Sequence, residues 1–160
     1  MLYIYNTIKT KNKDSLGRKT MNKVEYTPKI SKYQSIKSYE LDDGVFFQDM
    51  MVQDMGPKTL IVGLAKFEPG KSLPCHIHNV EESVTILKGN AYCDVEGVRT
   101  ALEPYDTSFI PANIPHRFVN SSDTEELIIL WAYSQIDDSF SRVNIDRITV
   151  PTDRCMLPKS

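Results

Sequence analysis

The chain has 160 residues, of which 41% are hydrophobic and 25% are charged, and its formal net charge is −2. This length predicts one domain with its own hydrophobic core and argues against two domains of ordinary size. The nearly neutral charge gives no global reason to bind nucleic acid, and no apolar run reaches the roughly 18 residues of a membrane span, so we expect a small-molecule partner.

The N-terminal segment is basic, whereas the remainder of the chain is acidic. Residues 1–24 contain one acid, Asp14, and six basic residues: Lys9, Lys11, Lys13, Arg18, Lys19 and Lys23. Because the whole chain holds 19 basic and 21 acidic residues, residues 25–160 hold 13 basic against 20 acidic ones. We interpret residues 1–39 as a flexible basic extension. A targeting segment, or an upstream extension of a chain that begins at Met21, are the alternatives.

The middle of the chain alternates short β-favouring runs with turn signals, such as Gly89-Asn90 and Glu96-Gly97. No sustained apolar period of about 3.6 residues interrupts this pattern, so helices should be few. We therefore predict an all-β barrel or sandwich over residues 40–140. The expected strands cover residues 45–52, 59–67, 83–88, 91–95, 98–102, 107–110, 117–120 and 127–133.

Residues 141–160 read as a C-terminal tail in which 145–150 could add an edge strand, stopped by Pro151. The chain has three cysteines, Cys75, Cys93 and Cys155, and no Cys-x-x-Cys spacing. An odd number without that spacing predicts neither a disulfide framework nor a thiolate zinc site. We therefore expect a reducing compartment, the cytoplasm.

All the histidines of the chain, His76, His78 and His116, fall into one pattern with Glu82. In an extended strand His76 and His78 point to the same face, which makes a clamp of two imidazoles. We expect a turn at 79–81 to return the next strand antiparallel, so that Glu82 lies beside this pair and His116 arrives from another strand. Three imidazoles and one carboxylate suit a divalent transition metal and leave coordination positions open for a substrate.

This pattern resembles the first signature motif of the cupins, a family of small β-barrels. The motif reads G-x5-H-x-H-x3-E-x6-G, and every fixed position is met by Gly70, His76, His78, Glu82 and Gly89. Glu81 would lie one residue too early for the motif. Strand parity also groups Glu82 with the apolar Val84 and Ile86, so Glu82 is the expected ligand.

The second cupin motif, G-x5-P-x-G-x2-H-x3-N, is matched by Pro111, His116 and Asn120. Tyr105 and Asn113 replace its two glycines. Asparagine tolerates left-handed backbone, so Asn113 is a mild change, whereas Tyr105 implies that its turn adopts a different geometry.

The resemblance, which covers about residues 60–135, implies a cupin-type double-stranded β-helix, or jelly-roll, barrel. It implies that His76, His78, Glu82 and His116 bind one divalent ion of Fe, Mn, Ni, Co or Zn, and that Glu82 can also act as a catalytic proton acceptor. Cupins include dioxygenases, decarboxylases, isomerases and lyases, so we expect a metal-dependent enzyme that acts on a small oxygen-rich metabolite. A non-catalytic module that binds a metal and a small ligand is the alternative, and a homodimer is expected by family analogy.

Five further side chains have both a structural and a functional interpretation. Trp131 and Tyr133 are expected in the core, with a place at the pocket mouth as the weaker hypothesis. Strand alternation points the Cys75 side chain away from the expected metal, so we expect it to be a buried, inert thiol. Arg99 and Arg117 could bind a substrate carboxylate, but a solvated surface position is at least as well supported.

Overall fold

The computed structural model describes residues 28–136 and 141–156. The chain divides into two units, Met1–Ile30 and Ser31–Ser160, and all strands of the described residues belong to the second. Most of the expected basic extension, residues 1–27, lies outside the described residues, so that interpretation stays a prediction.

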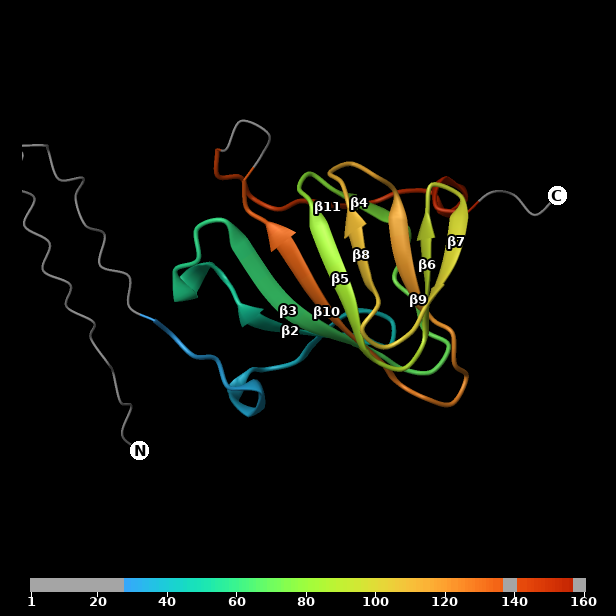
Figure 1. Ribbon diagram of the computed structural model, residues 1–160, viewed down its shortest axis with the longest axis horizontal. Coiled ribbons are helices and arrows are strands. Elements are labelled where there is room, and N and C mark those ends of the chain that lie inside the picture. The colour runs from blue at the N-terminus through green and yellow to red at the C-terminus, as the bar shows by residue number, and fades with distance from the viewer. Residues whose placement is uncertain (1–27, 137–140, 157–160) are drawn as a thin grey trace, which may run out of the picture. The chain divides into compact units, whose positions relative to one another are not determined.

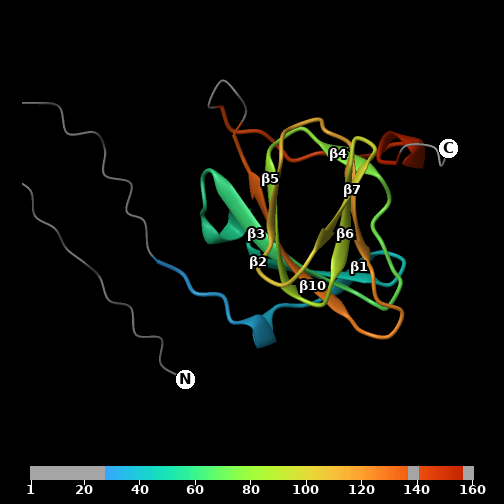
Figure 2. The same ribbon diagram turned by 45° about the vertical axis from the view of Figure 1, so that its right-hand side comes forward.

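Two antiparallel sheets form the domain, as Figure 1 shows. The first sheet contains, in spatial order, β1 (Tyr39–Asp42), β2 (Val45–Met51), β3 (Leu60–Phe67), β10 (Leu127–Ser134), β5 (Glu82–Lys88) and β8 (Thr107–Ile110). The second sheet contains β11 (Arg147–Thr149), β4 (His76–His78), β9 (His116–Asn120), β6 (Ala91–Val95) and β7 (Val98–Leu102). Figure 2 shows the strands of both sheets arranged around a common interior. The expected all-β jelly-roll barrel is confirmed.

The described residues contain no α-helix, only three 3-10 turns, η1 (Tyr33–Ser35), η2 (Gln53–Met55) and η3 (Thr152–Arg154). No helix among the described residues is therefore long and apolar enough to span a membrane. Three of the expected strands, β6, β7 and β8, have the bounds that the sequence predicted. The edge strand expected within 145–150 is the short β11, which pairs with β4.

The core lies between the sheets because alternate residues of each strand point inward. Along β10, Leu127, Ile129 and Trp131 are buried, while the intervening residues are more exposed. The register pairs Leu127 with Phe67 of β3 at one end of the strand and Tyr133 with Glu82 of β5 at the other. The interior thus changes from aliphatic and aromatic packing at one end to polar side chains at the other.

Trp131 belongs to the core, as expected, and it explains the glycine opposite it. The indole lies directly over Gly63 of β3, where an added Cβ would approach Trp131 Cζ2 to 2.0 Å. Any larger residue at position 63 would therefore displace the indole from the barrel interior.

The turn at Tyr105 corrects one prediction. Tyr105 has φ = 79° and Asn113 has φ = 65°, so both adopt the left-handed backbone that a glycine would supply. The expectation of a different turn geometry at Tyr105 was wrong. The Tyr105 side chain is 83% exposed, so it meets no packing conflict, and the left-handed conformation strains only the backbone, at a cost of about 1–2 kcal/mol.

The cysteines correct another prediction. Cys75 and Cys155 form a buried disulfide, whereas Cys93 is a free, buried thiol. Parity does turn Cys75 away from the metal-binding face, but the expectation of an inert thiol was wrong. The C-terminal segment folds back along β4 and brings Cys155 to it, a long-range contact that cysteine spacing does not encode.

Candidate metal centre

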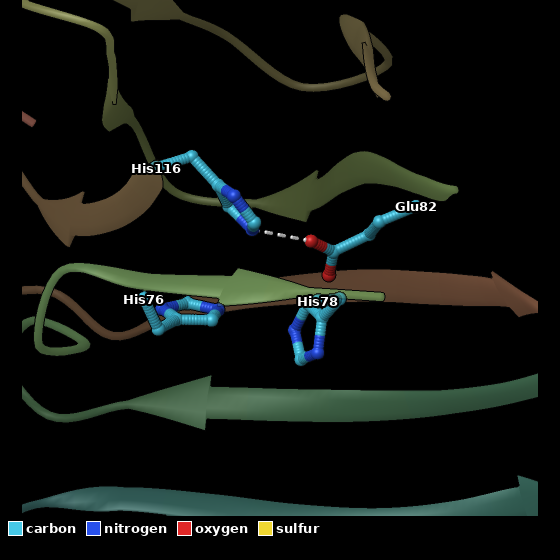
Figure 3. Close-up of side chains that lie close together, drawn as sticks. All are labelled: His76, His78, Glu82 and His116. Atoms are coloured by element: carbon cyan, nitrogen blue, oxygen red, sulfur yellow. Dashed lines mark hydrogen bonds and ion pairs between the residues drawn. The ribbon is translucent and has the colours of Figure 1, made fainter. Parts of the chain in front are cut away.

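Four buried side chains converge at the polar end of the barrel interior: His76, His78, Glu82 and His116 (Figure 3). One potential ligand atom from each lies within 4.8 Å of all the others. Their exposed fractions are 1%, 3%, 4% and 1%, respectively. The structure thus brings together all four residues predicted from the sequence, and it leaves the competitor Glu81 exposed.

Strand geometry explains the convergence. His76 and His78 alternate with Ile77 on β4, and His116, the first residue of β9, lies directly opposite His76. Glu82 reaches the centre by another route than expected. β4 and β5 do not pair; the chain crosses from the second sheet to the first, and Glu82 faces the histidines across the interior. The predicted antiparallel return was therefore wrong, because a jelly roll places these consecutive strands in opposite sheets.

Backbone carbonyls fix the orientation of all three imidazoles. Nδ1 lies 2.8 Å from the Pro74 oxygen in His76, 2.9 Å from the Asp146 oxygen in His78 and 2.8 Å from the Ile114 oxygen in His116. A carbonyl can only accept, so each Nδ1 carries the proton and each Nε2 presents a lone pair. Such bonds orient histidine ligands in metal sites.

The Nε2 atoms and Glu82 make an arrangement that calls for a cation. His116 Nε2 lies 2.6 Å from Glu82 Oε2, and the buried His78 Nε2 has no hydrogen-bond partner among the described residues. Lone pairs that face one another in a buried site repel unless a proton or a metal ion lies between them. The donor set of three imidazole nitrogens and one carboxylate therefore fits a divalent transition metal.

Burial favours, in His76 and His78, the neutral form that metal binding requires. Burial, followed by the nearby charge of His116, lowers the pKa of His76 from 6.5 to about 2. Burial likewise lowers the pKa of His78, although the Glu82 carboxylate acts in the opposite direction. A neutral imidazole can bind a metal without first releasing a proton.

Tyr133 belongs to this centre more closely than the sequence indicated. It lies opposite Glu82 in the β5–β10 register, and its ring centroid is 4.6 Å from that of His78. Burial, together with the charge of Glu82 and a hydrogen bond to it, raises the pKa of Tyr133 well above 10. The phenol therefore stays protonated and donates to the Glu82 carboxylate.

The two arginines considered as carboxylate-binding groups lie on the other face of the second sheet. Arg99 Nε and Arg117 Nε contact the two carboxylate oxygens of the fully buried Asp94 at 2.7 and 2.8 Å. Burial alone would raise the pKa of Asp94, but the hydrogen bonds from both arginines hold it below the ordinary value. These arginines stabilise the outer face of the barrel and do not reach the metal centre.

Arg147 is the charged residue near the centre that sequence reasoning missed. It lies on β11 directly opposite His78. The sequence predicted a strand around residue 147, but no local signal identified β4 as its partner. The side-chain parity of this strand therefore could not be related to the histidines.

Comparisons with known proteins agree with this architecture. A family model described as "Cupin domain" matches residues 63–133. An RmlC-like cupin from Shewanella frigidimarina aligns with a TM-score of 0.60 and 19% identity, over 72% of this chain and 97% of its own. The polyketide cyclase RemF from Streptomyces resistomycificus aligns at 0.64 and 17%, over 80% and 90%. A cupin-superfamily sugar phosphate isomerase from Silicibacter pomeroyi aligns at 0.57 and 19%, over 80% and 99%.

Proposed function

Residues 63–133 form a cupin domain, and on that basis we propose that the protein is a metal-dependent enzyme acting on a small oxygen-rich metabolite. The observation that carries this proposal is the orientation of the three imidazoles, whose Nδ1 protons are all bonded to backbone carbonyls. A protein that needed these histidines only for packing would not have to present three Nε2 lone pairs to one point.

In this proposal His76, His78, Glu82 and His116 hold one ion of Fe, Mn, Ni, Co or Zn, because their donor set does not choose among these metals. Bound there, the ion would act as a Lewis acid or, if redox-active, as the site of oxygen chemistry. Glu82 would be the group that accepts a proton from the substrate. Tyr133 holds the Glu82 carboxylate in place and supplies a proton donor next to it.

Dioxygenase chemistry and decarboxylase or isomerase chemistry are the reaction classes that we propose. Two of the similar structures are named as a polyketide cyclase and a sugar phosphate isomerase. Their identities of 17% and 19% support a common fold, so they favour an enzyme without selecting a reaction.

The burial of the centre favours one other function, a non-catalytic module that binds a metal and a small ligand. None of the four ligand residues is more than 4% exposed, which restricts the approach of a large substrate. Such a module would bind metal and ligand without turnover, whereas the enzyme would consume the ligand.

Elemental analysis of the purified protein, followed by assays with small hydroxy- and keto-acids, tests the proposal. Oxygen uptake would indicate a dioxygenase, and loss of the acid without oxygen uptake would indicate a decarboxylase or isomerase. His78→Ala and His116→Ala should lose both metal and turnover, while the exposed neighbour variant Glu81→Gln should keep both. Full activity in metal-free His116→Ala would refute the proposal.

We also propose a homodimer, by analogy with other cupins, which light scattering would test. The expected cytoplasmic location rested on unpaired cysteines. The Cys75–Cys155 disulfide removes that argument, because disulfides persist mainly in oxidising compartments. Fractionation of the cells that produce the protein would show its location.

A further inference from the structure

Arg147 points into the barrel interior, beside the metal centre. It lies directly opposite His78 in the antiparallel β4–β11 pair, and directly opposite residues place their side chains on the same face. His78 points inward, so Arg147 does as well, and its side chain is only 22% exposed.

The backbone that carries Arg147 is firmly held. The Asn79 side chain donates to the Asn144 oxygen at 2.8 Å and accepts from the Asp146 nitrogen at 2.8 Å. The Asp146 oxygen in turn binds His78 Nδ1. One set of contacts therefore positions both a metal-ligating imidazole and the adjacent guanidinium.

The guanidinium has an ion-pair partner but retains hydrogen-bonding capacity. Arg147 Nη2 lies 2.9 Å from Asp42 Oδ2, and Nη1 lies 3.4 Å from Oδ1. A guanidinium carries five N–H donors, and these two contacts engage at most two of them. The donors that Asp42 does not engage are directed to whatever acceptor enters the interior beside it.

Electrostatics place this charge within reach of the centre. Burial is the main reason why the pKa of His78 is lowered, and the Arg147 charge adds to the effect. The same charge acts on His76 and on Tyr133. Another buried donor, Trp131 Nε1, has no hydrogen-bond partner among the described residues and lies on the inward face of β10.

We propose that Arg147 is the residue that binds the carboxylate of the substrate, and that the substrate is a small 2-hydroxy- or 2-oxo-carboxylate. This inference rests on the proposed function, because it places the remainder of the substrate at the metal centre. The planar guanidinium fork matches a carboxylate, as its contact with Asp42 already illustrates. Asp42 holds the fork in position without using all of its donors.

Arg99 provides the matched control. It too is an arginine paired with a carboxylate, Asp94, but both of its contacts, through Nε and Nη2, are hydrogen bonds. It also lies on the outer face of the barrel. Its replacement therefore removes an ion pair without removing a donor from the interior.

The test measures binding of glycolate, and of its neutral analogue glycolamide, to full-length protein loaded with its own metal, by calorimetry. Arg147→Gln should weaken glycolate binding by about 10- to 100-fold and leave glycolamide binding unchanged. Arg147→Lys should restore part of the affinity for glycolate, and Arg99→Gln should behave like the wild type. Asp42→Asn should keep or increase affinity, because it removes a competing carboxylate and leaves the guanidinium in place.

The outcomes separate this inference from the proposed function. Wild-type protein that binds no metal would refute the metal enzyme itself. Protein that binds metal but no glycolate, or whose Arg147→Gln variant binds glycolate normally, would refute the role of Arg147 alone. Equal losses in Arg147→Gln and Asp42→Asn would mean that the pair only stabilises the fold. Tighter binding of inorganic phosphate than of glycolate would refute the carboxylate class.

Discussion

Removal of the Cys75–Cys155 disulfide should destabilise the barrel and loosen the metal centre together. The two cysteines are 80 residues apart in sequence. In the chain-entropy treatment, a cross-link that closes a loop of this length stabilises the folded state by about 4.5 kcal/mol, and native disulfides typically contribute about 2–5 kcal/mol. For a chain of this size, at about 2–4 °C per kcal/mol, a loss of about 4.5 kcal/mol corresponds to a fall in Tm of about 9–18 °C.

The effect should reach the metal because of what the disulfide fixes. The Val150 nitrogen donates to the Cys75 oxygen at 2.9 Å, and the Gly97 nitrogen donates to the Cys155 oxygen at 3.0 Å. Without the cross-link, the C-terminal segment can separate from β4 and withdraw the Asp146 oxygen from His78. Loss of such a partner typically weakens metal binding about 10- to 100-fold.

The assay compares thermal unfolding and chelator competition for the wild type and Cys75→Ala/Cys155→Ala. Cys93→Ala is the control, because it removes a buried thiol and leaves the cross-link intact. Reductant should lower the Tm of the wild type but not that of the double variant. Alkylation of the denatured wild type should modify one thiol without reductant and all three with it. Three reactive thiols without reductant would refute the reasoning.

Three further predictions follow from individual side chains. Tyr133→Phe should keep all four ligands yet weaken metal binding about tenfold, measured by chelator competition, because Glu82 loses its donor. Tyr105→Gly should raise the free energy of unfolding by about 0.5–1 kcal/mol by relieving the left-handed backbone, whereas Tyr105→Ala should not. In chelated protein, His76, with its pKa lowered to about 2 by burial, stays neutral where the unfolded chain takes up a proton. Urea unfolding should therefore show stability falling as the pH drops below about 6.5. His76 contributes at most about 1.4 kcal/mol per pH unit to this slope, and His76→Asn should reduce it by up to that amount, while His78, whose pKa burial also lowers, keeps its own contribution.

Much of the barrel could be predicted because its information is local. Strand alternation correctly placed Glu82 inward and Glu81 outward, and it separated His116 and Phe118 from Arg117. The clustering of His76, His78, Glu82 and His116 was predicted because these residues belong to short motifs of fixed spacing. Parity is a property of neighbouring residues, so a sequence reveals it without knowledge of which strands pair.

Strand pairing itself was beyond such reasoning. The strand that carries Glu82 was predicted to pair with the His76–His78 strand in one sheet, whereas the jelly roll places β4 and β5 in different sheets. The pairing of β11 with β4 joins residues that are about 70 positions apart, and both the disulfide and the position of Arg147 depend on it. Such contacts are stabilised by tertiary packing, so the sequence of the C-terminal segment contains no periodic pattern that would indicate them.

The features that the sequence predicted lie mainly within the span matched by the family model, and those that it did not predict lie mainly in the C-terminal segment. The four clustered side chains all lie within residues 63–133, the span that the cupin family model matches. Three groups near the centre lie outside this span: the Asp146 oxygen on His78, the Arg147 guanidinium, and Asp42, which pairs with that guanidinium. Tyr133 and the Pro74 and Ile114 oxygens, which also position the centre, lie within it. If the proposed function holds, a substrate bound by Arg147 would be selected by a part of the chain outside the matched span. Substitution of Arg147 should therefore change which ligand is bound while the metal remains, whereas loss of the Cys155 cross-link after β10 should loosen the metal itself.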